Sequence, residues 1–152
     1  MRGHMIDRLA GEWAGSGEGT FAGEAFAFEE TIWFEQAPGR PMLYYRLLAT
    51  EKAGGHLIHA ESGLWLIVDD AVTISIALPR ATEISEGSVV GDEIEVSSSY
   101  IGVASTVSEP HLIASERRYR CDGERLEYDI AIAMTGGSPD RHVWAALTRK
   151  GT

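Results

Sequence analysis

The chain has 152 residues, of which 44% are hydrophobic, and its 13 basic and 23 acidic side chains give a formal net charge of −10. So acidic a surface repels nucleic-acid backbones and anionic lipid, and we therefore expect neither nucleic acid nor a membrane surface as a partner. Cys121, the one cysteine, allows no intrachain disulfide, and the sequence shows neither a signal peptide nor a membrane-length apolar stretch, so we expect a cytoplasmic protein.

The sequence predicts one helical turn followed by strands in close succession. Residues 1–5 resemble the remnant of an expression tag, and we expect one domain over residues 6–150. A turn of helix around residues 5–10 could plug one end of the fold. Beyond it, apolar and polar residues alternate with a period of two, as in half-buried strands. Strands are predicted at residues 11–21, 26–34, 42–50, 57–68, 72–78, 82–90, 93–99, 105–109, 113–121, 125–134 and from His142 to Arg149.

These segments amount to about ten antiparallel strands with short turns, which predicts an all-β up-and-down barrel or a sandwich. Asp122 and Gly123 mark a tight hairpin between two of the strands, and Gly63 predicts a bulge or bend inside its own strand. A barrel of this size is wider than its own side chains fill. It therefore tends to enclose a ligand cavity.

The common catalytic signatures are absent from the sequence. It has no G-x-S-x-G nucleophile elbow, no phosphate-binding glycine loop and no H-E-x-x-H motif. The glycines within residues 15–19 precede no helix that could receive a phosphate, and we interpret them as close-packing positions near a plugging Trp13. His56 and His59 fall on opposite faces of a strand, which argues against a zinc site.

Charged residues within the strands are predicted to face solvent. No two of the strand carboxylates form a recognisable catalytic pair, and strand glutamates are usually exposed. Strand arginines are likewise interpreted as solvated or salt-bridged surface groups. The residues concerned are Glu29, Glu30, Glu35, Glu61, Arg46, Arg117 and Arg118.

His142 opens the last predicted strand and is the candidate metal ligand. An imidazole facing the interior of a barrel could hold a metal or a haem iron, although residue type alone favours an ordinary hydrogen-bonded histidine. Alternation places His142 on one face with Trp144, and Val143 on the other. Both faces could be buried, and a bulge near the start of the strand would change the assignment.

Four segments of the chain, in the right order, resemble the nitrobindins, a family of haem-binding β-barrels related in shape to fatty-acid-binding proteins. The segments are the G-x-W-x-G-x-G opening within residues 9–19, the H-x-E-x-G segment at 59–63, the strand at 126–134 and the closing segment at 142–147. The resemblance covers nearly the whole chain and implies an up-and-down barrel of the lipocalin or fatty-acid-binding-protein type.

The resemblance implies a b-type haem, one per chain, with His142 as the proximal ligand of a ferric iron. It also implies binding of nitric oxide and conversion of peroxynitrite to nitrate, for which a Lewis-acidic iron requires no acid–base pair. The remaining residues expected at the haem or along the cavity wall are His59, Ile58, Leu78, Met134 and Gly23. The sequence leaves the oligomeric state open, and a homodimer is compatible with it.

The sequence departs from the family around the expected haem cleft. Residues 20–24 lack a Y-P-T-like segment, the 136–141 loop is shorter than usual, and Leu78 stands at a position that is often polar. The changes at residues 20–24 and Leu78 favour an alternative, a haem-free lipocalin-like carrier of an apolar small molecule. A third interpretation is a structural or interaction module with no cavity. His59 also has two interpretations, a cavity residue or a buried histidine bonded to Glu61 or the backbone.

Overall fold

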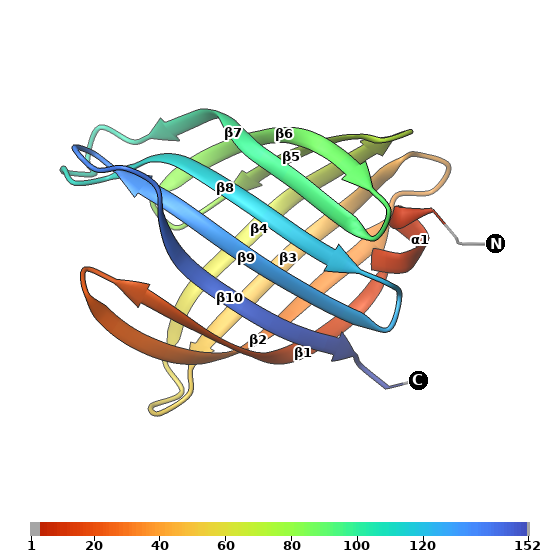
Figure 1. The fold of residues 1–152 in the computed structure, drawn as a ribbon, viewed down its shortest axis with the longest axis horizontal. Helices are drawn as coiled ribbons and strands as arrows, with labels where there is room; N and C mark the ends of the chain where they lie inside the picture. The colour runs from red at the N-terminus through yellow and green to blue at the C-terminus, as the bar shows by residue number, and fades with distance from the viewer. Residues whose placement is uncertain (1–3, 152) are drawn as a thin grey trace.

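Residues 4–151 are described by the structure, a computed structural model, and over this range ten antiparallel strands close into a barrel (Figure 1). Each strand pairs with its chain neighbours, and the first also pairs with the last. The elements are α1 (Met5–Leu9), β1 (Gly11–Phe21), β2 (Glu24–Gln36), β3 (Met42–Glu51), β4 (Leu57–Val68), β5 (Ala71–Ala77), β6 (Ala81–Val90), β7 (Glu93–Val103), β8 (Leu112–Cys121), β9 (Arg125–Met134) and β10 (Asp140–Arg149). The predicted all-β barrel with a short N-terminal helical turn is confirmed. Of the predicted tag remnant, residues 1–3 lie outside the described residues.

The strand predicted at residues 105–109 is wrong. β7 instead continues to Val103, and the following loop turns through a hydrogen bond from the Val107 N–H to the Ala104 carbonyl oxygen at 3.0 Å. Pairing between β7 and β8 stops at Ser97 and Glu116, so this segment has no neighbouring strand to bond. A short alternating run that lacks a partner remains a loop.

The helix α1 plugs one end of the barrel, as predicted. Trp13 is fully buried beneath it and donates from Nε1 to the Leu9 carbonyl oxygen at 2.8 Å. Arg8 donates to Asp92 Oδ1 at 2.7 Å, which ties the helix to the turn between β6 and β7. Within residues 4–151, no helix has the length and apolar character needed to cross a membrane.

The glycine-rich part of β1 lets the first and last strands approach closely. A Cβ atom at Gly15 would lie 2.1 Å from the Ala146 carbonyl oxygen on β10, and one at Gly17 would lie 2.5 Å from Phe28 Cζ. Only glycine fits at these positions without moving the neighbouring backbone or ring. The structure therefore supports the interpretation of these glycines as close-packing positions.

Aromatic side chains fill much of the barrel half near α1. Neighbouring rings have centroids 4.7 to 5.9 Å apart in tilted or edge-on arrangements, each such pair contributing about 0.5–1.5 kcal/mol beyond its buried area. The side chains are Phe34, Tyr45, Trp65, Tyr119 and Tyr128. This packing closes one half of the barrel and leaves space toward the other end.

Candidate functional site

A cavity of about 570 Å³ occupies the half of the barrel away from α1. Most of the residues predicted for the site line this cavity: His142, His59, Ile58, Leu78 and Met134. Gly23, the remaining predicted residue, is not among the lining residues and lies in the turn between β1 and β2. The structure thus gathers all but one of the predicted residues around a single space, and it goes against the interpretation that required no cavity.

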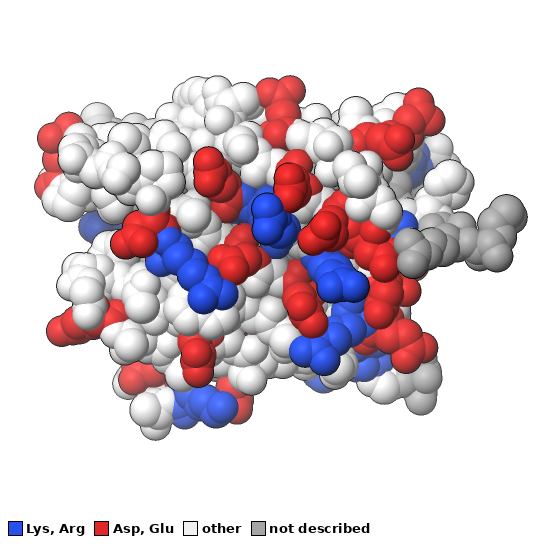
Figure 2. Space-filling view, viewed as in Figure 1, with Lys and Arg blue, Asp and Glu red and all other residues white. Residues whose placement is uncertain are grey.

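A second hollow of about 550 Å³ lies on the outer surface over β8, β9 and β10. Basic and acidic side chains are interspersed across this face (Figure 2). They form exposed ion pairs between Arg118 and Glu95, Arg125 and Glu127, and Arg141 and Asp129. Because exposed ion pairs are screened by solvent, whereas ligand sites are concave and mostly apolar, the interior cavity is the better candidate site.

His142 reaches the cavity because β10 carries a bulge. The register between β10 and β9 shifts between Arg141 and Val143. As a result His142 and its neighbour Val143 both line the cavity, although adjacent residues of a regular strand face opposite ways. Trp144 points away from the cavity, and the Arg141 guanidinium lies 3.8 Å from the centre of its ring. The bulge therefore decides that His142 faces the cavity, which alternation along the strand left open.

One hydrogen bond fixes the proton on the His142 ring. His142 Nδ1 lies 2.9 Å from the Thr20 carbonyl oxygen, which can only accept. Nδ1 is therefore the protonated nitrogen, and Nε2 keeps a free lone pair. Burial, the largest cause, lowers the pKa of His142 and favours this neutral form. The Phe21 and Phe26 rings flank the imidazole, with centroids 5.8 and 6.1 Å away.

The rim segment that departs from the nitrobindins is the one that holds His142. Phe21 pairs with Glu24, and the two residues between them, Ala22 and Gly23, have φ values of 51° and 84°. Two successive left-handed residues are the backbone of a tight two-residue hairpin turn. This short turn brings Phe21 to the imidazole ring and the Thr20 carbonyl to Nδ1. The altered segment therefore supports the candidate ligand.

His59 fits both of its predicted roles at once. It lines the cavity, and its Nε2 atom lies 2.8 Å from Glu61 Oε2. The side chain of His59 is 41% exposed, whereas that of Glu61 is 4% exposed. His59 therefore joins the open part of the cavity to the buried polar groups beneath it.

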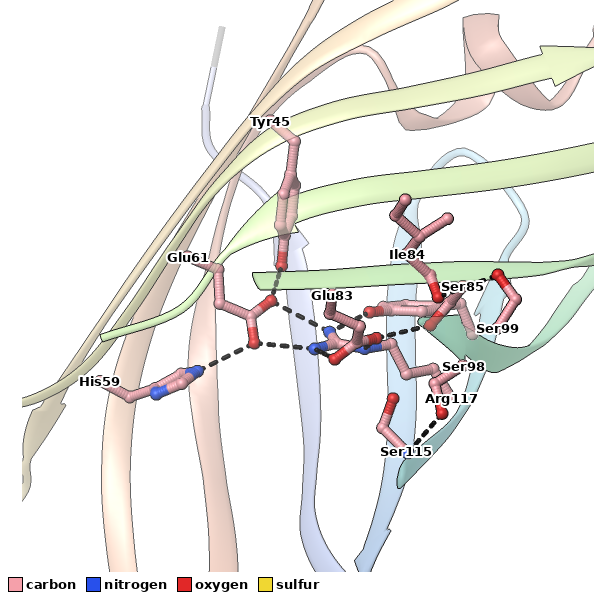
Figure 3. Close-up of polar contacts among 11 residues, drawn as sticks. Tyr45, His59, Glu61, Glu83, Ile84, Ser85, Ser98, Ser99, Ser115 and Arg117 are labelled. Carbon is pink, nitrogen blue, oxygen red and sulfur yellow. Dashed lines mark hydrogen bonds and ion pairs between the residues drawn. The ribbon is translucent and has the colours of Figure 1, made fainter. Parts of the chain in front are cut away.

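A buried ion-pair network forms part of the cavity wall (Figure 3), and the prediction that two of its members, Glu61 and Arg117, lie at the surface is wrong. Arg117 is 4% exposed, Glu61 5% and Glu83 0%. The guanidinium donates to Glu61 at 3.0 and 3.1 Å, to Glu83 at 2.9 and 3.1 Å, and to Tyr119 Oη at 3.0 Å. Because a guanidinium has five N–H groups, every donor of Arg117 is already used.

The network is held in its charged form. Burial alone would raise the pKa of Glu61, but Arg117 and His59 outweigh it and hold that pKa well below its usual range. Burial alone would lower the pKa of Arg117, but nearby groups, the Glu61 and Glu83 carboxylates among them, raise it. Tyr45 donates a further hydrogen bond to Glu61 Oε1 at 2.8 Å. One cation between two carboxylates leaves the group with a net negative charge.

The period-two alternation of the strands could have predicted that these charged side chains are buried. On β8, Arg117 lies between Ser115 and Tyr119, which are both buried, and on β2, Glu30 lies between Phe28 and Ile32, which are buried too. Residues two apart share a face of a strand, so these neighbours place the charged side chains inside. Charged residues are usually exposed, but that rule gives the wrong prediction for these side chains because their charges are paired in the interior.

Glu30 lies near this network and has one oxygen without a partner. Its side chain is buried, and the Tyr128 hydroxyl donates to Glu30 Oε2 at 2.7 Å. No hydrogen-bond partner is found for Glu30 Oε1 among the described residues. Burial, the largest cause, and the Glu61 carboxylate raise the pKa of Glu30 to about 8, against the lowering effects of Tyr128 and Arg117. At neutral pH, Glu30 is therefore mostly an uncharged carboxylic acid.

We expect Glu30→Gln to stabilise the protein most at alkaline pH. Below the ordinary glutamate pKa of 4.5 the carboxyl is neutral whether the chain is folded or not, and above about 8 the folded state must hold a buried charge. Its contribution to stability therefore falls as pH rises through this window, by roughly 3–5 kcal/mol in all. Urea unfolding at acidic and alkaline pH measures the gain over the natural chain. Glu95→Gln, at an exposed glutamate, is the control and should show no such rise.

Three comparisons relate this chain to known proteins. A family model for the THAP4-like, heme-binding beta-barrel domain matches residues 4–149. Peroxynitrite isomerase 1 of Mycobacterium tuberculosis (strain ATCC 25618 / H37Rv) is 34% identical over 155 residues, covering 95% of this chain and 93% of the relative. Peroxynitrite isomerase of Nocardia farcinica is 34% identical over 148 residues, covering 93% and 86%. The crystal structure of Rv2717c from M. tuberculosis superposes with a TM-score of 0.85 and 30% identity, covering 99% of this chain and all of that one.

Proposed function

The chain belongs to the THAP4-like, haem-binding β-barrel family, and from this premise we propose that it is a haem protein that isomerises peroxynitrite to nitrate. The family model spans almost the whole chain, and two relatives named peroxynitrite isomerase share 34% identity with it. The nitrobindin resemblance of the sequence points to the same activity. No observation of the described residues favours the haem-free carrier as the main function.

The residues at the mouth of the cavity fit a haem. The observation that carries the proposal is the hydrogen bond from His142 Nδ1 to the Thr20 carbonyl oxygen. This bond leaves Nε2 with a free lone pair for a metal ion, on a side chain that lines the cavity. Haem-ligating histidines need this arrangement, in which a second partner orients the ring and fixes its tautomer. Phe26, Leu78 and Met134 add apolar surface of the kind a porphyrin needs.

In this proposal each residue has a limited task. Thr20 holds the His142 ring in place, and Phe21 and Phe26 keep water from its flanks. When bound, ferric haem supplies a Lewis-acidic iron that promotes rearrangement of the peroxynitrite O–O bond. His59 lines the same cavity and, through Glu61, is held in a fixed position. No acid–base pair is required of the protein.

The finer parts of the proposal are a b-type haem, ferric iron, one haem per chain and nitric oxide as a second small ligand. The interior cavity, with His142 at its mouth, supports one haem per chain. The position of the single cysteine supports a haem held without a covalent link, as a b-type haem is, because Cys121 is buried near α1 and cannot form a thioether link in the cavity.

Haem loading followed by peroxynitrite decay tests the proposal. Titration with haemin is expected to give a saturable Soret band at one equivalent. The loaded protein should then speed the decay of peroxynitrite and raise the yield of nitrate relative to the same chain without haem. Decay at the same rate with and without haem would count against the isomerase activity, and absence of a saturable Soret band would count against haem binding itself.

A further inference from the structure

The inner end of the cavity differs from its mouth. Glu30 lies four residues along β2 from Phe26, the residue whose ring packs against His142. At about 3.3 Å per residue, Glu30 lies roughly 13 Å further along β2 than Phe26, and therefore deeper in the barrel than the candidate haem ligand. Apolar side chains line the cavity around this depth, among them Phe28, Leu47 and Ile130. The inner end is therefore apolar surface surrounding a few buried polar groups.

This inner end is unsuited to an anion. A buried arginine with free N–H groups would attract a carboxylate, but here Glu61, Glu83 and Tyr119 use every N–H group of Arg117. The two carboxylates also leave the group with a net negative charge, which repels a second anion. A charged ligand would lose its hydration without gaining a partner, and that is costly.

Glu30 offers a hydrogen-bond donor that an uncharged ligand could use. The Tyr128 hydroxyl donates to Oε2, so the proton of the neutral carboxyl belongs on Oε1, the oxygen that has no partner among the described residues. A buried donor without an acceptor is destabilising, because it has lost its hydrogen bonds to water. Glu30 lines the cavity, and after a small rotation of its carboxyl group a carbonyl oxygen in the cavity would accept from this O–H group and remove the cost.

We infer that the inner end of the cavity is a binding subsite for an uncharged molecule with a carbonyl group, with Glu30 Oε1 as the hydrogen-bond donor. The apolar part of such a molecule, a ketone or an ester for example, would lie against Phe28, Leu47 and Ile130. This inference goes beyond the proposed function and does not depend on haem. Carbonyl binding and haem binding are measured separately, so either can fail while the other stands.

Binding should weaken at alkaline pH because Glu30 then loses the proton that it donates. The charged or titratable groups that act on Glu30 come from three other strands: Tyr128 of β9, Glu61 of β4 and Arg117 of β8. The residues paired with Glu30 on the flanking strands, Gly15 of β1 and Ala49 of β3, carry no charge. The pKa of Glu61 is lowered and those of Arg117 and Tyr128 are raised, so Glu30 is the one of these four groups that titrates between about pH 7 and pH 9.5.

Calorimetric titration of the purified chain with 2-heptanone and with hexanoate, two molecules of matched size, tests the inference. At neutral pH we expect the ketone to bind at least roughly tenfold more tightly than the carboxylate. Between about pH 7 and pH 9.5 the affinity for the ketone should fall by roughly tenfold or more, as Glu30 ionises. Glu30→Gln keeps an N–H donor of the same shape, so its affinity for the ketone should not change with pH.

Glu95→Gln is the matched control, since it removes a carboxylate that is 61% exposed and should leave the pH dependence as in the natural chain. The inference is overturned if the ketone does not bind, if hexanoate binds equally well, or if the affinity of the natural chain for the ketone is the same across this pH range. The pH profile of the natural chain is decisive by itself should Glu30→Gln fail to fold.

Discussion

Replacing His142 with alanine is expected to lower the affinity of the chain for haem by on the order of 100-fold, because the candidate axial nitrogen is removed. The remaining cavity keeps its apolar walls, so weak haem uptake without axial coordination should persist. Haemin titration followed by the position and height of the Soret band measures both the affinity and the coordination. The fold should be intact, because His142 lies at the cavity mouth rather than in the aromatic core.

His111→Ala is the matched control for this experiment. His111 also lines the cavity, but its ring is engaged elsewhere, with Nδ1 3.2 Å from the Leu112 carbonyl oxygen. Its replacement should leave haem affinity and the Soret band close to those of the natural chain. A His142→Ala protein with the same affinity and spectrum as the natural chain would show that another group holds the iron.

Replacing Arg117 with methionine is expected to destabilise the fold by about 3–5 kcal/mol, which is the usual cost of breaking a buried ion pair. Methionine has a similar length but no charge, so Glu61 and Glu83 would remain buried without their cation. The pKa of Glu61, which Arg117 now lowers, would rise, and the protein should become less stable still as pH increases through the new value. Urea unfolding at neutral and mildly acidic pH measures the loss and its dependence on pH.

The neighbouring residue provides the control. Arg118 forms an ion pair with Glu95 on the outer surface, where the two side chains are 63% and 61% exposed. Because exposed pairs contribute little, Arg118→Met should change the free energy of unfolding by less than about 1 kcal/mol. Equal stability of the two variants would mean that the Arg117 network does not hold the barrel together.

Much of the fold could be predicted from the sequence because the barrel is made of local hairpins. Alternation and turn residues located the ten strands, and each strand pairs with the next one along the chain. The error at residues 105–109 has the same physical origin, since alternation says nothing about whether a partner strand is within reach. The candidate haem ligand, His142, came from a family resemblance and not from the chemistry of the residue itself.

The sequence by itself determined the succession of antiparallel strands and the glycine-rich opening, and its family resemblance indicated a barrel and the histidine at the start of the last strand. The tertiary structure decided which way that histidine faces, because a bulge between Arg141 and Val143 depends on pairing with β9. It also decided which ring nitrogen is free, because the Thr20 carbonyl that engages His142 Nδ1 lies far away in the chain. Likewise, alternation indicates that Arg117 faces the same side of β8 as its buried neighbours two residues away. Only closure of the barrel brings Glu61 and Glu83, on other strands, within hydrogen-bond distance of Arg117. A charge is stable in the interior only with its partners in place, and those partners are contacts between distant parts of the chain.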